Sequence, residues 1–303
     1  MCAELVKTIC PFCGVGCGIY LKVNEQGQLL SVEPQQNHPI SQGKLCDKGW
    51  STAYAINSDQ RLTQPLKRIN KSFYPISWQE ALTTIADELT AIIDESGSKA
   101  VGVISSARAS NEDNYAAQKF ARAVLQTNNI DHCARICHSP TVAGLKQSLG
   151  SGAMTNSAKD IFDTDLMLVF GADPTENHSI LGGHIMQAHA QGTELIVVDP
   201  RVTRLAKLTP MHLQLKLGSN IALINALLHI IIKERWFDQH FVETRCQGFE
   251  QLAQHVKDIT PESVESTTGV SAELIRATAK AYSQAKRAMI FYGMGITQYV
   301  SGT

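Results

Sequence analysis

The chain has 303 residues, of which 44% are hydrophobic, and its formal net charge is −1. This length is enough for two or three domains with a sizeable core, and the balanced charge gives no support for a nucleic-acid or anionic-membrane partner. The most apolar stretch, residues 221–232, contains Asn225 and His229 and is too short to span a bilayer, so it predicts a buried helix and no membrane insertion. The first residues carry no secretory or twin-arginine signal, and we expect a cytoplasmic protein.

Residues 1–60 are predicted to form short strands and turns around a group of cysteines. Segments 19–23 and 29–32 predict a β-hairpin across a turn at 24–28. The cysteines of this region that matter here are Cys10, Cys13, Cys17 and Cys46.

The spacing of these four cysteines predicts a metal centre rather than disulfides. Three thiols lie within eight residues and the fourth is distant, so that a tight loop supplies three ligands and a remote residue supplies the last. Four thiolates suit tetrahedral zinc or an iron–sulfur cluster. Zinc ribbons usually use two separated Cys-x2-Cys pairs, whereas the second pair is missing here. The glycines between the cysteines let backbone amides turn toward the sulfurs, which suits a reducible cluster. We therefore expect a [4Fe–4S] cluster in a reducing compartment, with zinc or inert cysteines as the alternatives.

Residues 61–132 are predicted to be the first part of an α/β domain. Residues 65–75 are basic and irregular, which indicates a linker. Ser77 and Glu80 form a capping-box pattern at the start of a helix. Residues 100–105 predict a short buried strand, and the segment from Ser110 begins a helix that runs to about residue 125. The first helix has its apolar residues on one face, at Leu82, Ile85, Ala86, Leu89, Ile92 and Ile93.

Residues 133–303 are predicted to form a dinucleotide-binding-like α/β domain. The apolar runs 166–170 and 195–198 predict strands that are buried on both faces, and a helix at 180–191 connects them as a parallel pair. The remaining predicted elements are a third strand through Leu213, Leu215 and Leu217, helices at about 220–236, 248–257 and 271–285, and a last strand at 288–292. The fold class is α/β with parallel sheets behind a small cluster domain.

Four loops follow the predicted strands and contain residues that suit a nucleotide ligand. Such loops line the crevice in which open α/β sheets bind ligands. Amides at helix starts suit phosphates, acidic side chains can hold ribose hydroxyls or a guanine edge, and Arg201 can pair with a phosphate. Each loop alone is compatible with an ordinary turn, but four in register favour a binding site. The loops are residues 171–177, 199–201, 218–220 and 293–295.

A further cysteine stands beside a histidine, at Cys137 and His138. A buried cysteine next to a capping histidine is the plain interpretation. A soft thiolate next to an imidazole also suits a metal ligand with a proton-handling neighbour.

Together these motifs resemble the molybdenum- or tungsten-dependent oxidoreductases that carry two molybdopterin guanine dinucleotides. The resemblance rests on Cys-x2-Cys-x3-Cys, a distant Cys-x-Lys-Gly, Cys-His, Asp-Pro-Arg, and the segments 127–138, 218–223 and 293–298. It extends from Cys10 to Thr303 and is greatest to the catalytic (alpha) subunit of formate dehydrogenase. It implies an iron–sulfur domain followed by parallel-sheet α/β domains of the molybdopterin oxidoreductase type. Members of this family continue for several hundred residues, so we expect this chain to stop before the C-terminal domain and before an arginine that orients formate.

The resemblance also implies roles for individual residues. The [4Fe–4S] cluster is held by Cys10, Cys13, Cys17 and Cys46. Lys48 lies on the electron path between cluster and pterin, Cys137 is a ligand of the metal, and His138 assists at formate. The residues implied to line the pterin dinucleotides are Asp173, Glu176, Asp199, Arg201, Gly218, Asn220, Met294 and Gln298.

The reaction implied is the oxidation of formate to carbon dioxide at a molybdenum or tungsten bis(molybdopterin guanine dinucleotide) centre. Electrons would leave through the [4Fe–4S] cluster to an electron-transfer subunit or another redox protein. One alternative is an assimilatory nitrate reductase of the same superfamily, which usually lacks a histidine directly after the metal-ligating cysteine. The other alternative is a non-catalytic chain that binds the cluster and partner proteins only.

Overall fold

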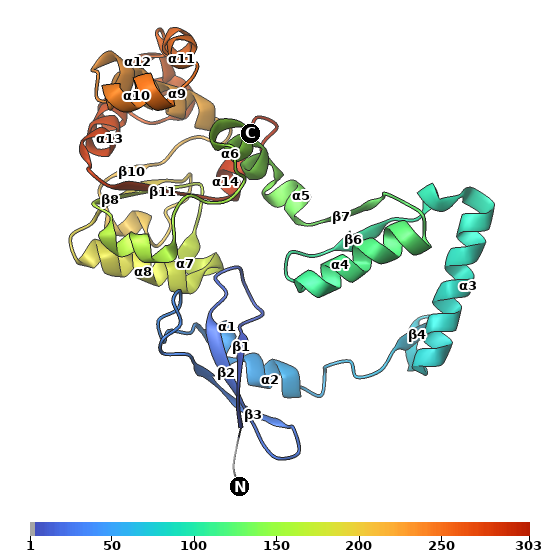
Figure 1. Ribbon diagram of the computed structural model, residues 1–303. Coiled ribbons are helices and arrows are strands. Elements are labelled where there is room, and N and C mark those ends of the chain that lie inside the picture. The colour runs from blue at the N-terminus through green and yellow to red at the C-terminus, as the bar shows by residue number, and fades with distance from the viewer. Residues whose placement is uncertain (1–3) are drawn as a thin grey trace. The chain divides into compact units, whose positions relative to one another are not determined.

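The computed structural model describes residues 4–303, which divide into two compact units (Figure 1). Unit 1 runs to Cys137, and unit 2 is His138–Thr303. Within the described residues, no helix has both the length and the apolar character needed to cross a membrane.

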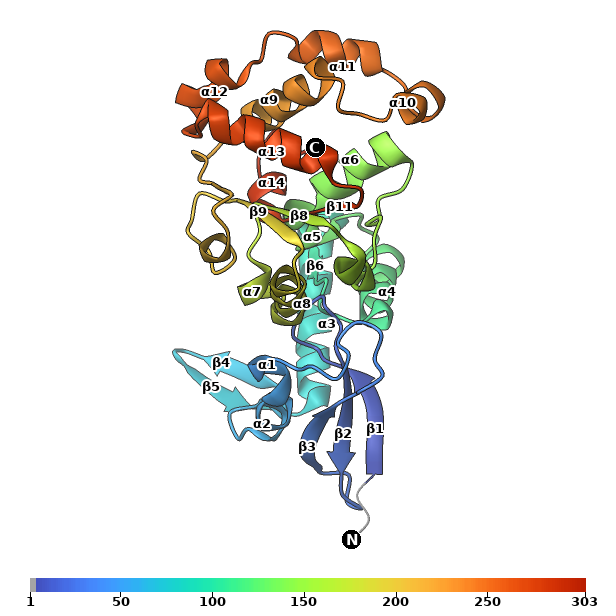
Figure 2. The same cartoon turned by 90° about the vertical axis from the view of Figure 1, so that its left-hand side faces the viewer.

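Unit 1 begins with a three-stranded antiparallel sheet in the order β1-β2-β3 (Figure 2). The predicted hairpin is confirmed, because β2 pairs with β3 and the Asn24 side chain accepts hydrogen bonds from the N–H groups of Gln26 and Gln28 in the turn. The strand β1 and two short helices are additions to the prediction. The bounds are Glu4–Ile9 for β1, Gly18–Val23 for β2, Leu29–Pro34 for β3, Asp47–Trp50 for α1 and Thr52–Asn57 for α2.

The segment predicted as a linker is a second hairpin. Its strands β4 (Leu66–Ile69) and β5 (Ser72–Pro75) pair antiparallel around Asn70, whose φ is +56°. The linker prediction was wrong because both strands are largely exposed and neither shows the apolar alternation that marks a half-buried strand: β4 is Leu-Lys-Arg-Ile and β5 is Ser-Phe-Tyr-Pro.

Helix α3 (Trp78–Ser96) begins where the capping pattern predicted. The Ser77 hydroxyl accepts the N–H of Glu80 at 3.1 Å. The carboxylate of Glu80 pairs with Lys67 of β4 at 3.3 Å, and only the serine half of the predicted box is seen. The apolar face of α3 is not covered, since Leu82 is 59% exposed and Ile85 is 54% exposed.

A short parallel pair, β6 (Val103–Ser105) with β7 (Ile130–His132), follows α3. The strand predicted at 100–105 is confirmed over Val103–Ser105, but its predicted burial was wrong, because Ile104 is 91% exposed. Residues 98–100 form a 3-10 turn instead. The complete capping box of Ser110 and Asp113 starts α4 (Asn111–Lys119) as predicted. A π-helical turn at Phe120–Val124 and helix α5 (Ala134–Cys137) complete unit 1.

Unit 2 is built on a four-stranded parallel sheet in the order β10-β9-β8-β11. The strands are β8 (Leu166–Phe170), β9 (Glu194–Val198), β10 (His212–Leu213) and β11 (Ala288–Tyr292). The predicted third strand is much shorter than expected: the chain leaves the sheet after Leu213, and Leu217 is 78% exposed.

Alternate residues of β8 pack into two separate cores. Leu166 and Phe170 contact helices α9 and α13 on one face, while Met167 and Val169 face α8. This is the period of two that a strand buried on both faces requires. The sequence analysis missed α6, α10 and α12 and the short helices α7 and α14. The helices of unit 2 are α6 (Ser139–Leu149), α7 (Pro174–Asn177), α8 (Ser179–Ala190), α9 (Asn220–Lys233), α10 (Gln239–Arg245), α11 (Phe249–Val256), α12 (Pro261–Thr268), α13 (Ala272–Gln284) and α14 (Met294–Thr297), with 3-10 turns at Ala158–Asp163 and Ala206–Leu208.

Candidate functional site

The four cysteines of the N-terminal motif come from the β1–β2 loop and the start of α1. Cys10 and Cys17 are joined across the base of the loop by a hydrogen bond from the Cys10 N–H to the Cys17 carbonyl, at 2.8 Å. Gly16, with φ +64°, turns the chain and donates its N–H to the Cys13 carbonyl at 3.3 Å. Cys46 is the residue that precedes α1. The spacings of three and four residues, together with Gly16, let one tight loop carry three thiols.

Burial and mutual repulsion act on these thiols. Burial, followed by the charges of Cys10, Cys13 and Cys46, raises the pKa of Cys17 to about 11. Burial, with lesser contributions from Cys13 and Cys46, also raises the pKa of Cys10. The four sulfurs are therefore close enough to interact, and a positively charged metal centre would relieve their repulsion.

The donor set fits an iron–sulfur cluster. Within residues 4–303 no three His, Cys, Asp or Glu side chains are arranged to hold a single metal ion. Four cysteine thiolates are the ligand set of a [4Fe–4S] cluster, and the charges of Cys10, Cys13 and Cys46 all act on Cys17. Lys48 lies in α1 two residues after Cys46, and its side chain is exposed.

Cys137 is the last residue of unit 1 and His138 is the first residue of unit 2. Cys137 ends α5, its N–H donates to the Cys133 carbonyl at 3.2 Å, and partial burial raises the pKa of its thiol. His138 is exposed, and its Nδ1 lies 3.2 Å from the Thr141 hydroxyl. The side chain of His138 does not cap helix α6. His138 nevertheless occupies the N-cap position of α6, and Cys137 is partly buried.

In unit 2, three of the four predicted loops meet at the carboxyl edge of the sheet. The N–H of Gly295, after β11, donates to the carbonyl of Gly171, after β8, at 2.9 Å. The Asn220 amide, at the start of α9, donates to the carbonyl of Gly295 at 3.2 Å. Gly171 has a φ of +59°, and a Cβ added to it would lie 2.8 Å from the Cα of Gly295. Only glycine permits this approach of the two loops.

The fourth loop, after β9, is held by a buried aspartate. Asp199 is 3% exposed, and its Oδ1 accepts the backbone N–H of Arg201 at 2.8 Å and the Arg201 Nε at 3.3 Å. The Asp199 carbonyl accepts a hydrogen bond from His212 Nε2 at 2.9 Å. The Arg201 side chain remains 64% exposed, which leaves most of its guanidinium available to a phosphate.

The other predicted pterin residues lie in or beside these loops. Asp173 is buried and its Oδ1 accepts the Thr175 hydroxyl at 2.6 Å. The exposed residues of the set are Glu176, Gly218, Met294 and Gln298. Sequence reasoning missed Thr175 and His212 as supports of the site. The sequence signal for Thr175 was an Asp-x-Thr pattern at a helix start, whereas no sequence pattern marks His212.

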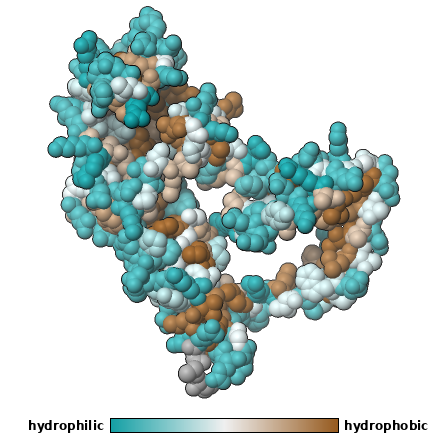
Figure 3. Space-filling view, in the orientation of Figure 1, coloured by the Kyte–Doolittle hydropathy of each residue, from teal (hydrophilic) through white to brown (hydrophobic). Residues whose placement is uncertain are grey.

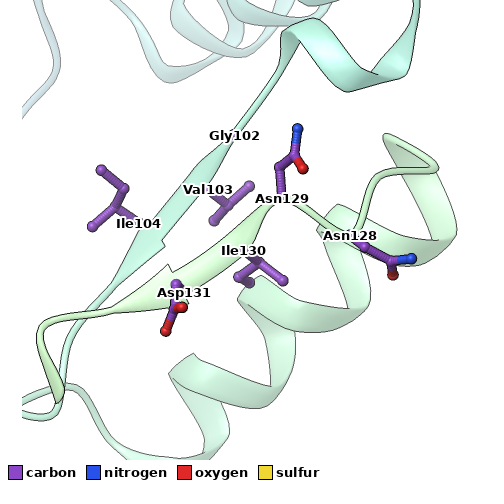
Figure 4. A pocket seen from close by; sticks show the side chains of 7 residues that line it. All are labelled: Gly102, Val103, Ile104, Asn128, Asn129, Ile130 and Asp131. Atoms are coloured by element: carbon purple, nitrogen blue, oxygen red, sulfur yellow. The ribbon is translucent and has the colours of Figure 1, made fainter. Parts of the chain in front are cut away.

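An open hollow of about 300 Å³ lies elsewhere, beside β6 and β7 (Figure 4). Residues 102–104 and 128–131 line it. None of the predicted site residues is among them.

Comparison with protein families gives two adjacent matches. Residues 3–58 match the molybdopterin oxidoreductase Fe4S4 domain, and residues 61–303 match molybdopterin oxidoreductase. These are the domains of a [4Fe–4S] cluster and a molybdopterin cofactor, as the resemblance predicted.

Individual proteins agree with the family match. The chain is 46% identical over 299 residues to the F420-dependent formate dehydrogenase subunit alpha of Methanocaldococcus jannaschii, covering 99% of this chain and 44% of that protein. It is 46% identical over 304 residues to formate dehydrogenase H of Escherichia coli, covering 98% and 42%. The chain thus spans less than half the length of these relatives.

A solved structure shares the fold. Acetylene hydratase from Pelobacter acetylenicus superposes with a TM-score of 0.81 at 25% sequence identity, covering 96% of this chain and 40% of that one. Because the second family match takes in most of the sequence, and the cluster domain stands directly before it, the chain belongs to the molybdopterin oxidoreductase family.

Proposed function

We propose that this protein, as its organism makes it, oxidises formate to carbon dioxide. The observation that carries the proposal is the 46% identity, over almost the whole chain, to two proteins named formate dehydrogenases. The reaction converts formate to carbon dioxide, one proton and two electrons. The Cys137–His138 pair supports the same reaction, because a soft metal ligand and a proton acceptor stand side by side in the chain.

The chain offers donors for two cofactors. We assign Cys10, Cys13, Cys17 and Cys46 to the [4Fe–4S] cluster. Cys137 would be the protein ligand of a molybdenum or tungsten bis(molybdopterin guanine dinucleotide). When bound, the metal–pterin group supplies two-electron chemistry and the cluster supplies single-electron transfer. The raised pKa of Cys137 keeps its thiol protonated in the absence of metal, so metal binding would release this proton.

The loops at the carboxyl edge of the unit 2 sheet are proposed to hold the dinucleotide part of the pterins. Asp199 fixes its loop from inside and leaves the Arg201 guanidinium exposed for a phosphate. Asn220 ties the start of α9 to the loop after β11. The other residues assigned to this binding surface are Asp173, Glu176, Gly218, Met294 and Gln298.

His138 is proposed to take the proton that formate oxidation releases. In the tautomer whose Nδ1–H donates to the Thr141 hydroxyl, Nε2 would be the proton acceptor. Lys48 lies in α1, two residues after Cys46, and would place a positive charge next to the cluster. A separate redox protein or subunit would then accept the electrons.

The test is anaerobic purification of the protein from its own organism, followed by metal analysis and assays with a viologen dye. Formate-dependent dye reduction, with iron and either molybdenum or tungsten present, is the expected result. Reduction of nitrate without oxidation of formate would replace the proposal with the nitrate reductase alternative. Iron without molybdenum or tungsten, and no turnover of either substrate, would favour the non-catalytic alternative.

A further inference from the structure

The turn after β9 is held by two side chains from β10 and the residues that follow it. Figure 3 shows many hydrophilic side chains on the face of unit 2, and this turn is a polar part of the same unit, so hydrogen bonds have to fix it where apolar packing does not. His212, in β10, donates its Nε2–H to the carbonyl of Asp199 at 2.9 Å. Gln214 donates its side-chain amide to the carbonyl of Pro200, also at 2.9 Å. The two bonds engage the two consecutive carbonyls that stand directly before Arg201.

Burial alternates along residues 212–215 and places both donors on the side away from the core. Leu213 is 0% exposed and Leu215 is 4% exposed, and both belong to the hydrophobic cluster that contains α9 and α13. His212 is half-buried and Gln214 is exposed. Strand β10 runs parallel to β9, with His212 opposite Val197. Side chains at the end of β10 therefore reach the carbonyls that follow β9.

The peptide bond between Pro200 and Arg201 is held on both of its sides. Its carbonyl accepts the Gln214 amide, and its N–H donates to Asp199 Oδ1 at 2.8 Å. The proline ring fixes the φ of residue 200, and the hydrogen bonds on either side of the peptide restrict the ψ of the same residue. The main chain at Arg201 thus has a set direction before any ligand arrives.

The guanidinium of Arg201 keeps its outer nitrogens for a ligand. Within the part of the chain that the structure describes, its side chain bonds through Nε alone, to Asp199 Oδ1 at 3.3 Å, and it is 64% exposed. The planar fork of an arginine binds two phosphate oxygens at once, but only from a matching direction. A rotation of the main chain at Arg201 would therefore remove one of these two hydrogen bonds.

We propose that His212 and Gln214 are positioning residues for Arg201. By holding the carbonyls of residues 199 and 200, they set the direction in which the guanidinium meets a phosphate of the pterin dinucleotide. This role rests on the proposed assignment of the loops of unit 2 to the dinucleotide, and not on formate as the substrate. It requires no contact between either side chain and the ligand.

The experiment uses the protein as its organism makes it, purified anaerobically. Guanosine monophosphate, released by acid hydrolysis from the protein-bound fraction, measures how much dinucleotide remains after gel filtration at a series of times. His212→Leu and Gln214→Met each remove one donor, whereas His212→Gln retains one. Thr209→Val is the matched control, because the Thr209 hydroxyl donates to the carbonyl of Leu195, at the opposite end of β9 from the turn. Arg201→Ala, alone and combined with each donor variant, shows whether an effect passes through the arginine.

His212→Leu and Gln214→Met should each speed the loss of dinucleotide by about fivefold, since each removes one hydrogen bond. Neither should speed it further in the Arg201→Ala background, because the side chain through which they act is then absent. His212→Gln should restore the wild-type rate to within about twofold. Thr209→Val should lower the unfolding temperature and leave the loss of dinucleotide unchanged.

An equal acceleration with and without Arg201 would overturn the proposal, as would a loss from Thr209→Val as fast as that from Gln214→Met. An unchanged rate in both donor variants would overturn it as well. A protein that holds the dinucleotide but does not oxidise formate would refute the proposed reaction, while the same loss rates would still support or refute the positioning role. Absence of the dinucleotide from the wild-type protein would overturn both.

Discussion

At the scale of single residues, the thiols of the cluster motif carry the clearest chemical signature. Cys17 is almost fully buried among three other cysteines, and its thiol holds its proton to a pKa of about 11. A buried thiol of this kind is a poor nucleophile and a poor ligand until a metal replaces its proton.

The iron-free protein should lose stability as the pH rises from 9 to 11. In this range the unfolded chain releases the Cys17 proton while the folded chain keeps it, so the folded state binds more protons and alkali favours unfolding. The stabilisation is complete below the unfolded pKa of about 9 and is lost as the pH passes through 11. Denaturant titrations across this range measure the slope. Cys17→Ala should reduce the slope, and Cys246→Ala, at an exposed cysteine, should not. An identical slope in wild type and Cys17→Ala would contradict the assignment.

Cys137→Ser tests the proposed metal ligand, and His138→Ala tests the proposed proton acceptor. In the protein as its organism makes it, Cys137→Ser should depress turnover strongly, because a hard oxygen replaces a soft thiolate at the metal. His138→Ala should retain iron and molybdenum or tungsten, lower turnover by about 100-fold, and alter the pH profile. Its effect on the free energy of unfolding should be below about 1 kcal/mol, since one exposed hydrogen bond is lost. Normal turnover per folded Cys137→Ser molecule would remove the metal-ligand assignment.

At the scale of elements, close backbone contacts position the loops of the candidate site. The loop that contains Asp173 leads into α7 and packs on α8 at Gly182. A Cβ added to Gly182 would lie 2.7 Å from the Cα and N of Thr175, the residue whose hydroxyl binds Asp173. The adjacent Gly183 has no atom within 4 Å of the same position.

These two adjacent glycines should respond to alanine in opposite directions. Gly182→Ala should destabilise unit 2 by about 2 kcal/mol, because main chain must move to admit the methyl group. Gly183→Ala should stabilise it by about 0.5–1 kcal/mol, since alanine is the better helix former. Chemical denaturation of the two variants measures the difference. Equal destabilisation in both variants would show that any methyl group added to this turn of α8 lowers stability. The contact with the Asp173 loop would then not be the cause.

At the scale of the whole molecule, the two units differ in the size of their hydrophobic cores. Two large hydrophobic clusters lie in unit 2, on either face of its sheet. The N-terminal sheet of unit 1 encloses a much smaller buried set, with Ile19 and Val32 among its members. Metal ligation stabilises folding most where the apolar core is small.

Removal of iron by a chelator should therefore lower the unfolding temperature of unit 1 and leave unit 2 unchanged. Trp50 and Trp78 belong to unit 1 and Trp236 to unit 2, so replacing one set by phenylalanine lets fluorescence follow each unit separately. The Trp236 transition serves as the internal control. A shift of both transitions by the same amount would mean that the units unfold together.

The sequence by itself determined the features that depend on local pattern. The Ser77 and Ser110 helix starts and the strands β8 and β9 were predicted correctly, because capping and two-sided burial leave direct marks on neighbouring residues. The same motifs were sufficient to predict the family.

Tertiary structure alone decided what depends on residues distant in the chain. No local pattern encodes how strands assemble. That assembly sets the order β10-β9-β8-β11, the approach of Gly171 to Gly295, and the hydrogen bond from Asn220 to the loop after β11. Burial is decided in the same way. The stripe of α3 and Ile104 of β6 have the sequence of a core yet lie exposed, because hydrophobicity records what a residue prefers to contact, whereas its exposure depends on which partner is present.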